Sequence, residues 1–94
     1  MTYSIVRLAV KDYAQWKTVF DEATTLRKSY GSRGVRVFRS VDKPNELVLL
    51  AEYEDIQRAR QLFQSAEFRE ATQRAGVTGL PDVTLADEVH QLPA

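Results

Sequence analysis

The chain of 94 residues contains no cysteine and one histidine, and its 13 basic residues are balanced by 13 acidic ones. Without cysteine it forms no disulfide, no thiolate nucleophile and no cysteine-ligated zinc or iron–sulfur site. One histidine excludes a histidine-rich metal site within a single chain. A net charge of zero argues against general nucleic-acid binding, which normally requires a basic excess.

Long apolar runs are also missing. No run approaches the roughly 20 residues that span a bilayer, and the N-terminus lacks the pattern of a signal peptide. Apolar residues make up 44% and charged residues 28% of the chain, which is ordinary for a globular domain. We therefore expect a single domain over residues 1–94, cytoplasmic, with neither a membrane nor a nucleic acid as partner.

The residues that are present predict the element order β-α-β-β-α-β. β-Branched and aliphatic segments predict strands over residues 3–10, 35–41, 46–54 and 82–90. Apolar residues at three- and four-residue spacing predict helices over residues 12–30 and 55–75, the second divided at Ser65. Residues 77–81 are expected to form a loop. This order is that of an α+β, ferredoxin-like fold, with a four-stranded antiparallel sheet and the helices on one face.

Local signals mark the helix ends. Asp12 precedes the first helix and Gln15 follows three residues later, which is the spacing of a capping box. Gly31 and Gly76 stand where a helix ends in a left-handed residue.

The second and third predicted strands, residues 35–41 and 46–54, are expected to form a hairpin around the turn at residues 42–45. A symmetric turn places Phe38 opposite Leu49 and Arg36 opposite Ala51. One hairpin face then carries both aromatic residues of the hairpin. Its members are Arg36, Phe38, Ser40, Leu47, Leu49, Ala51 and Tyr53. The other face carries Val35, Val37, Arg39, Val41, Glu46, Val48, Leu50 and Glu52.

Apolar residues occupy both faces of the predicted sheet, most clearly over residues 47–51. Helices can cover only one face, so the other would be an exposed apolar patch, which monomers rarely tolerate. We therefore expect a homodimer formed through the uncovered face of the sheet, because two-fold pairing is the commonest way to bury such a patch.

Three stretches resemble a known family: residues 10–17 with 20–21, residues 37–40 with 42–46, and residues 74–77 with 79–81. The chain resembles small bacterial dimeric α/β-barrel proteins near the antibiotic biosynthesis monooxygenases. The resemblance implies ferredoxin-like subunits paired sheet to sheet, each with a ligand pocket between helices and sheet. Relatives with known chemistry are cofactor-free oxygenases or haem degraders that use a helical histidine. The only histidine here, His90, lies near the end of the last predicted strand, so we expect no cofactor.

Aromatic residues supply the candidate ligand site. Five aromatic residues line a pocket for a small hydrophobic or aromatic ligand under one interpretation, and simply form the core under the other: Trp16, Phe20, Phe38, Tyr53 and Phe63. Tyr53 is the most informative of them, because a buried hydroxyl needs a hydrogen-bonding partner and a ligand can supply it.

Two charged candidates complete the set. Arg36 belongs to a stretch between Ala23 and Val41 that has no acid and five cations, namely Arg27, Lys28, Arg33, Arg36 and Arg39. These cations either bind an anionic group or are neutralised by acidic residues of the paired strand. Arg36 is favoured among them for the ligand, and its alternative is to pack its stem along the sheet edge. His90 is either an exposed residue at a strand end or an acid–base group of the pocket. Glu52 is expected to need a cation, with Arg39 of the same chain or of the twin as candidate.

Two functions are compatible with these residues. The first is a cofactor-free monooxygenase or cyclase acting on a small aromatic or polyketide-like molecule, whose catalytic residues stay unassigned because no general base is identifiable. The alternative is a non-catalytic dimeric module that binds a small hydrophobic ligand or has a stress or structural role. The volume and lining of a cavity between helices and sheet would distinguish them best.

Overall fold

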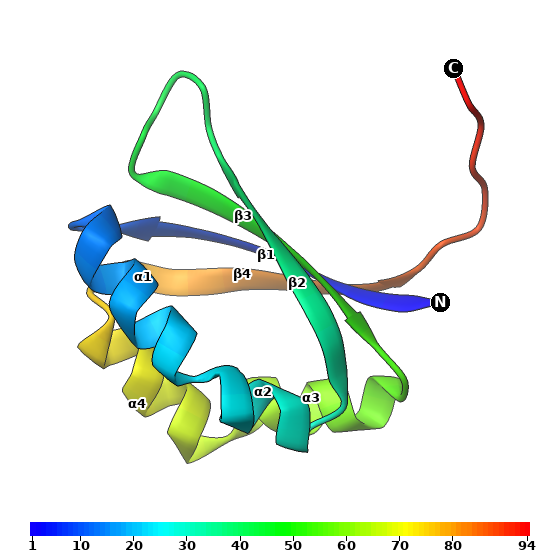
Figure 1. The fold of residues 1–94 in the computed structure, drawn as a ribbon, viewed down its shortest axis with the longest axis horizontal. Coiled ribbons are helices and arrows are strands. Elements are labelled where there is room, and N and C mark those ends of the chain that lie inside the picture. Colours follow the sequence, from blue (N-terminus) through cyan, green and yellow to red (C-terminus); the bar gives the residue numbers. More distant parts are fainter.

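The computed structural model describes residues 1–94 and contains one antiparallel sheet with all its helices on one face (Figure 1). The elements in chain order are β1 (Thr2–Val10), α1 (Tyr13–Glu22), α2 (Thr24–Ser29), β2 (Ser32–Arg39), β3 (Glu46–Tyr53), α3 (Ile56–Gln64), α4 (Ala66–Arg74) and β4 (Val77–Asp87). The strands lie in the order β2-β3-β1-β4. The predicted ferredoxin-like fold is confirmed. None of the helices is both long and apolar enough to cross a membrane.

The first predicted helix is two helices, which meet at Ala23. Asp12 caps α1, because its carboxylate accepts hydrogen bonds from the backbone N–H groups of Ala14 and Gln15 at 3.4 and 3.3 Å. The expected reciprocal bond of a capping box is replaced. The Gln15 side chain instead donates to the Arg74 carbonyl at 3.1 Å and so ties α1 to the end of α4.

Gly31 and Gly76 end their helices as predicted, with φ angles of +86° and +76°. At Gly76 an added Cβ would lie 3.3 Å from Nε2 of Gln15, whereas at Gly31 it would meet nothing within 4 Å. Gly76 therefore combines a left-handed backbone with a crowded position.

Replacing Gly76 with alanine should lower the free energy of unfolding by about 1–2 kcal/mol, the cost of a left-handed conformation for a residue with a Cβ. Gly31→Ala should lower the free energy of unfolding by no more than Gly76→Ala does, because an added Cβ at Gly31 meets no neighbouring atom and only the left-handed backbone opposes it. Urea denaturation of both variants measures the difference. An unchanged midpoint for Gly76→Ala would show that this turn relaxes freely.

The predicted hairpin register is wrong by one residue. Phe38 pairs with Val48 and Arg36 with Leu50. The reason lies in the turn, because Ser40 rather than Val41 pairs with Glu46 and the loop is one residue longer than predicted. The Ser40 hydroxyl accepts from the N–H groups of Asp42 and Lys43 within this loop. Since side chains alternate along a strand, a one-residue slip moves each of them to the opposite face.

This slip exchanges the β2 residues between the two faces. Val35, Val37 and Arg39 share the helix-covered face with Leu49 and its neighbours on β3. Arg36 and Phe38 lie on the opposite face of the sheet, which the helices leave uncovered and which we call the open face.

The last strand begins at Val77, where a loop was predicted, and ends at Asp87. Gly79 and Pro81 indicate a loop in the sequence, but β4 is an edge strand, and an edge strand tolerates proline. The strand pairing shifts between Arg7 and Ala9, and Leu80 projects from this irregularity with 95% of its surface exposed. Beyond Asp87 the tail rises away from the sheet on the side opposite the helices (Figure 1).

Candidate functional site

A cavity of about 90 Å³ lies between the helices and the sheet. It is lined by 19 residues from both layers, 16 of them hydrophobic. The other three are Ser4, Arg27 and Thr72. Tyr53 adds a phenolic hydroxyl, so a few polar groups face an otherwise apolar space, as is typical of small-molecule sites.

Aromatic rings form two walls of this cavity. On α1, Trp16 and Phe20 are one helical turn apart and stack with their ring centres 4.6 Å apart. Tyr53 of β3 meets Phe63 of α3 edge-on at 6.4 Å, and Phe63 meets Phe68 of α4 at 5.0 Å. Four of the five predicted aromatic residues, Trp16, Phe20, Tyr53 and Phe63, are therefore brought to one cavity.

Arg27 enters the cavity from α2. Its Nη1 donates to the Phe20 carbonyl at 2.7 Å and its Nη2 to the Thr24 hydroxyl at 3.1 Å, and these bonds brace the junction of α1 and α2. Its guanidinium carbon lies 3.8 Å from the centre of the Phe20 ring. These contacts fix the cation at the aromatic wall and leave its remaining N–H donors unused.

Tyr53 is 2% exposed. Burial raises the pKa of its hydroxyl above the ordinary value for tyrosine, against smaller opposing effects from the Ser4 hydroxyl and the Arg27 charge. Burial also lowers the pKa of Arg27, but a guanidinium stays charged at neutral pH. At neutral pH the cavity therefore holds a protonated phenol as donor beside a cation.

The raised pKa of Tyr53 predicts how stability changes in alkali. The folded protein holds the phenolic proton more tightly than the unfolded chain, so this contribution is complete below about pH 10, the ordinary tyrosine pKa, and is lost as pH rises above it. Between pH 9 and pH 11 the free energy of unfolding should fall more for the wild type than for Tyr53→Phe. Urea denaturation at both pH values tests this, and equal falls would contradict it.

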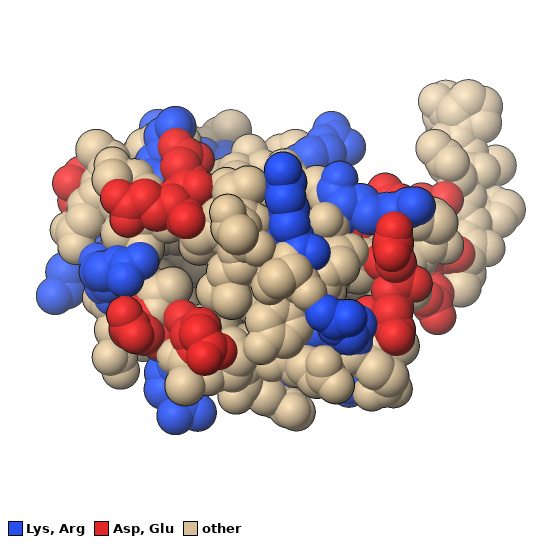
Figure 2. Space-filling view, turned by 60° about the horizontal axis from the view of Figure 1, so that its bottom comes forward, with Lys and Arg blue, Asp and Glu red and all other residues tan.

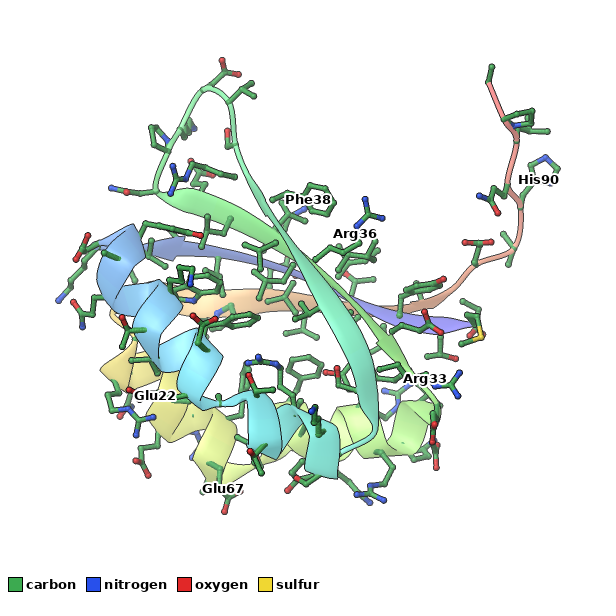
Figure 3. All side chains as sticks on the ribbon, in the orientation of Figure 1. Glu22, Arg33, Arg36, Phe38, Glu67 and His90 are labelled. Atoms are coloured by element: carbon green, nitrogen blue, oxygen red, sulfur yellow. The ribbon has the colours of Figure 1, made fainter.

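The structure separates the other predicted site residues from this cavity. Arg36 and Phe38 project from the open face, and His90 lies on the tail far from both (Figure 3). Arg36 lines a second, wider hollow of about 780 Å³ on the open face, together with Tyr3 and Glu52. The ligand-binding roles of Arg36, Phe38 and His90 stay predictions, but none of these residues lines the helix–sheet cavity.

The cation next to Glu52 is Arg33 rather than Arg39. Arg33 lies 3.9 Å from Glu52 and 3.1 Å from Glu54 across the hairpin. Arg39 faces the other way and lies over the Tyr13 ring at 4.2 Å. The reason is the register, because Arg39 shares the helix-covered face.

Comparisons with known proteins show which family this chain resembles. A family model for antibiotic biosynthesis monooxygenases matches residues 6–74. The chain belongs to the antibiotic biosynthesis monooxygenase family. Comparison with curated protein sequences finds no significant match.

Solved structures of this family share the fold over almost the whole chain. A candidate antibiotic biosynthesis monooxygenase from Bordetella bronchiseptica superposes with a TM-score of 0.79 at 22% identity, covering 95% of this chain and 97% of that one. SnoaB, a cofactor-independent oxygenase from Streptomyces nogalater, gives 0.77 at 21% identity over 99% and 97%. A third, from Caulobacter crescentus, gives 0.74 at 18% over 95% and 90%.

The sequence did not single out Ser4, and it marked Arg27 only as one of five cations that could bind an anionic group. A signal for Arg27 was present. Counting from Trp16 and Phe20 through Ala23, the steps of four, three and four residues end at Arg27, so the arginine continues the apolar stripe of the helix. Ser4 carried no comparable signal, because its burial depends on the helices that cross β1.

The outer surface of the helices carries no comparable site. Figure 2 shows basic and acidic side chains interspersed over this side rather than gathered by sign. Glu22 and Glu67 point outward from it (Figure 3). No group of three histidine, cysteine, aspartate or glutamate side chains is placed to hold a metal ion.

Proposed function

We propose that this protein is a cofactor-independent oxygenase that acts on a small phenolic molecule in the helix–sheet cavity. The observation that carries the proposal is that one aromatic, otherwise apolar cavity holds both the Tyr53 hydroxyl and the Arg27 guanidinium. Family membership and the likeness to SnoaB, which is described as a cofactor-independent oxygenase, support it.

The reaction needs no external reductant, because the substrate supplies all the electrons. A phenol with a free para carbon reacts with O₂ to give the para-quinone and water. One oxygen atom bonds to the ring carbon and becomes the new carbonyl, and the other leaves as water with the two hydrogens that the ring loses. The ring gives up four electrons, and these reduce O₂ completely.

The cavity residues act on the phenolate form of the substrate, which is the electron-rich form that reacts with O₂. Arg27 stabilises the negative charge, and Tyr53, protonated at neutral pH, donates a hydrogen bond to the same oxygen. Such preorganised donors act strongly where water is excluded. Trp16 and Phe20 pack against the ring and complete the dry wall.

Oxygen uptake with phenol and 2-methoxyphenol, compared with 1,8-dihydroxyanthrone and with buffer alone, tests the activity. The proposal predicts quinone formation above the buffer rate with one oxygen-18 atom incorporated per product from ¹⁸O₂. If neither phenol nor 2-methoxyphenol reacts above the buffer rate, the proposal is overturned and the alternative, a ligand-binding module without chemistry, remains. The three-ring 1,8-dihydroxyanthrone should not react above the buffer rate, because the cavity of about 90 Å³ is too small for it.

We further propose that two copies pair through their open faces. Tyr3, Ile5, Val48 and Leu50 lie there, only partly buried, and Phe38 is 43% exposed. The helices do not reach these side chains, so a contiguous apolar surface is left in water, which is unfavourable for a lone chain. The corrected register supports the pairing, because it adds Phe38 to the open face.

A further inference from the structure

We propose that the ligand of the cavity is a single-ring aromatic anion, whose ionised oxygen is bound by Arg27. The proposal rests on the cavity being the ligand site, as in the proposed function, and adds the charge and the size of the ligand. It assigns Arg27 the role of selecting an anionic group, a role that the sequence favoured for Arg36.

Arg27 is an unmatched charge. No aspartate or glutamate lines the cavity, and Arg27 makes no ion pair. Asp21, whose charge it senses, pairs with Lys17 at 2.7 Å. A half-buried cation among apolar residues is costly unless a partner compensates it, and an anionic ligand would supply that partner.

The position of the cation matches an aryl anion. Its guanidinium lies against Phe20, which stacks on Trp16, so an aromatic ligand in the cavity meets the ring wall and the cation together. Arginine presents a planar fork of N–H donors, and a carboxylate or a phenolate oxygen accepts from such a fork. Only two of the Arg27 N–H groups donate to protein acceptors, namely the Phe20 carbonyl and the Thr24 hydroxyl.

The volume of the cavity limits how many rings the ligand can have. The cavity measures about 90 Å³, whereas a buried cavity that accommodates benzene measures about 150 Å³. One ring fits after small movements of side chains. Two or three fused rings would have to displace the packed aromatic residues Phe63 and Phe68, whose rings meet edge-on at 5.0 Å.

The single tryptophan provides a direct probe, because Trp16 is 3% exposed and lines the cavity. Its indole N–H signal in ¹⁵N-labelled protein at pH 7 is followed during titration with benzoate, benzamide and 9-anthracenecarboxylate. Benzoate and benzamide have one ring and differ in charge. Benzoate and 9-anthracenecarboxylate share the charge and differ in size.

The wild type should bind benzoate at least tenfold more tightly than benzamide and should show no saturable shift with 9-anthracenecarboxylate. Arg27→Met should reduce the preference for benzoate to within twofold while benzamide binding persists. Arg27→Lys retains the charge and should retain a preference for benzoate, which covers the case in which the methionine variant does not fold. Arg33→Met, which changes an exposed arginine outside the cavity, should behave as the wild type does.

Equal affinities of benzoate and benzamide, tight binding of 9-anthracenecarboxylate, or no shift with any probe would overturn the inference. These outcomes are separate from those for the oxygenase activity. Selective benzoate binding without quinone formation would remove the proposed reaction and keep the selectivity of Arg27. Turnover of phenols together with equal affinities for benzoate and benzamide would keep the proposed reaction and remove the selectivity of Arg27.

Discussion

Replacing Tyr53 with phenylalanine should lower kcat for oxygenation of a single-ring phenol by about 100-fold, the effect of removing one preorganised donor from a developing oxyanion. The substitution removes only the hydroxyl and retains the ring that packs against Phe63 at 6.4 Å. KM should change little, because the apolar walls that hold the ring stay in place. Steady-state oxygen uptake separates the two constants.

Tyr30→Phe is the matched control. Tyr30 is a partly buried tyrosine at the end of α2 that packs against the core but does not line the cavity. Its loss of a hydroxyl should leave kcat unchanged. An equal fall in both variants, or an unchanged kcat in Tyr53→Phe, would show that the Tyr53 hydroxyl takes no part in the reaction.

Replacing Phe38 with aspartate should raise the dissociation constant of the homodimer by about 100-fold or more, equivalent to roughly 3 kcal/mol. Phe38 lies on the open face and is 43% exposed in the single chain. In a two-fold pair the substitution occurs twice, so two carboxylates would have to be buried in an apolar interface. Sedimentation equilibrium at low micromolar concentration measures the change.

Thr25→Asp introduces the same charge at an exposed position on α2, on the far side of the molecule from the open face. This variant should remain dimeric. Circular dichroism of Phe38→Asp shows whether the dissociated chain stays folded. A wild type that sediments only as monomer, or a Phe38→Asp variant that dimerises normally, would remove the open face as the interface.

Local signals explain why most of the fold could be predicted. Asp12, Gly31 and Gly76 act within one helical turn of their position, so the cap and the left-handed residues found in the structure follow from the sequence alone. The order of strands and helices follows from hydrophobic periodicity for the same reason. Among the helices, the break at Ala23 was not predicted, because apolar spacing continues across it.

Features that depend on the exact geometry of a turn or on the order of strands in the sheet could not be predicted in this way. The hairpin register depends on the length of the turn, and a shift of one residue moved Arg36 and Phe38 to the other face. The start of β4 was missed because Gly79 and Pro81 are tolerated only at a sheet edge, and strand order decides which strand is the edge.

The same distinction holds for the candidate site. Trp16 and Phe20 were predicted together because their spacing on one helix is local. Tyr53 was predicted because a buried hydroxyl needs a hydrogen-bonding partner. Choosing between Arg27 and Arg36 required the pairing of β2 with β3. That register places Arg36 away from the cavity, whereas Arg27 lines it.

We propose that the helix–sheet cavity, rather than the open face, binds the aromatic ligand. A crystal structure of the protein with benzoate bound tests this most directly. We expect a single ring against Trp16 and Phe20, with its carboxylate within hydrogen-bond distance of Arg27 and near the Tyr53 hydroxyl. A ring bound in the open-face hollow beside Arg36, or a cavity that stays closed to benzoate, would contradict it.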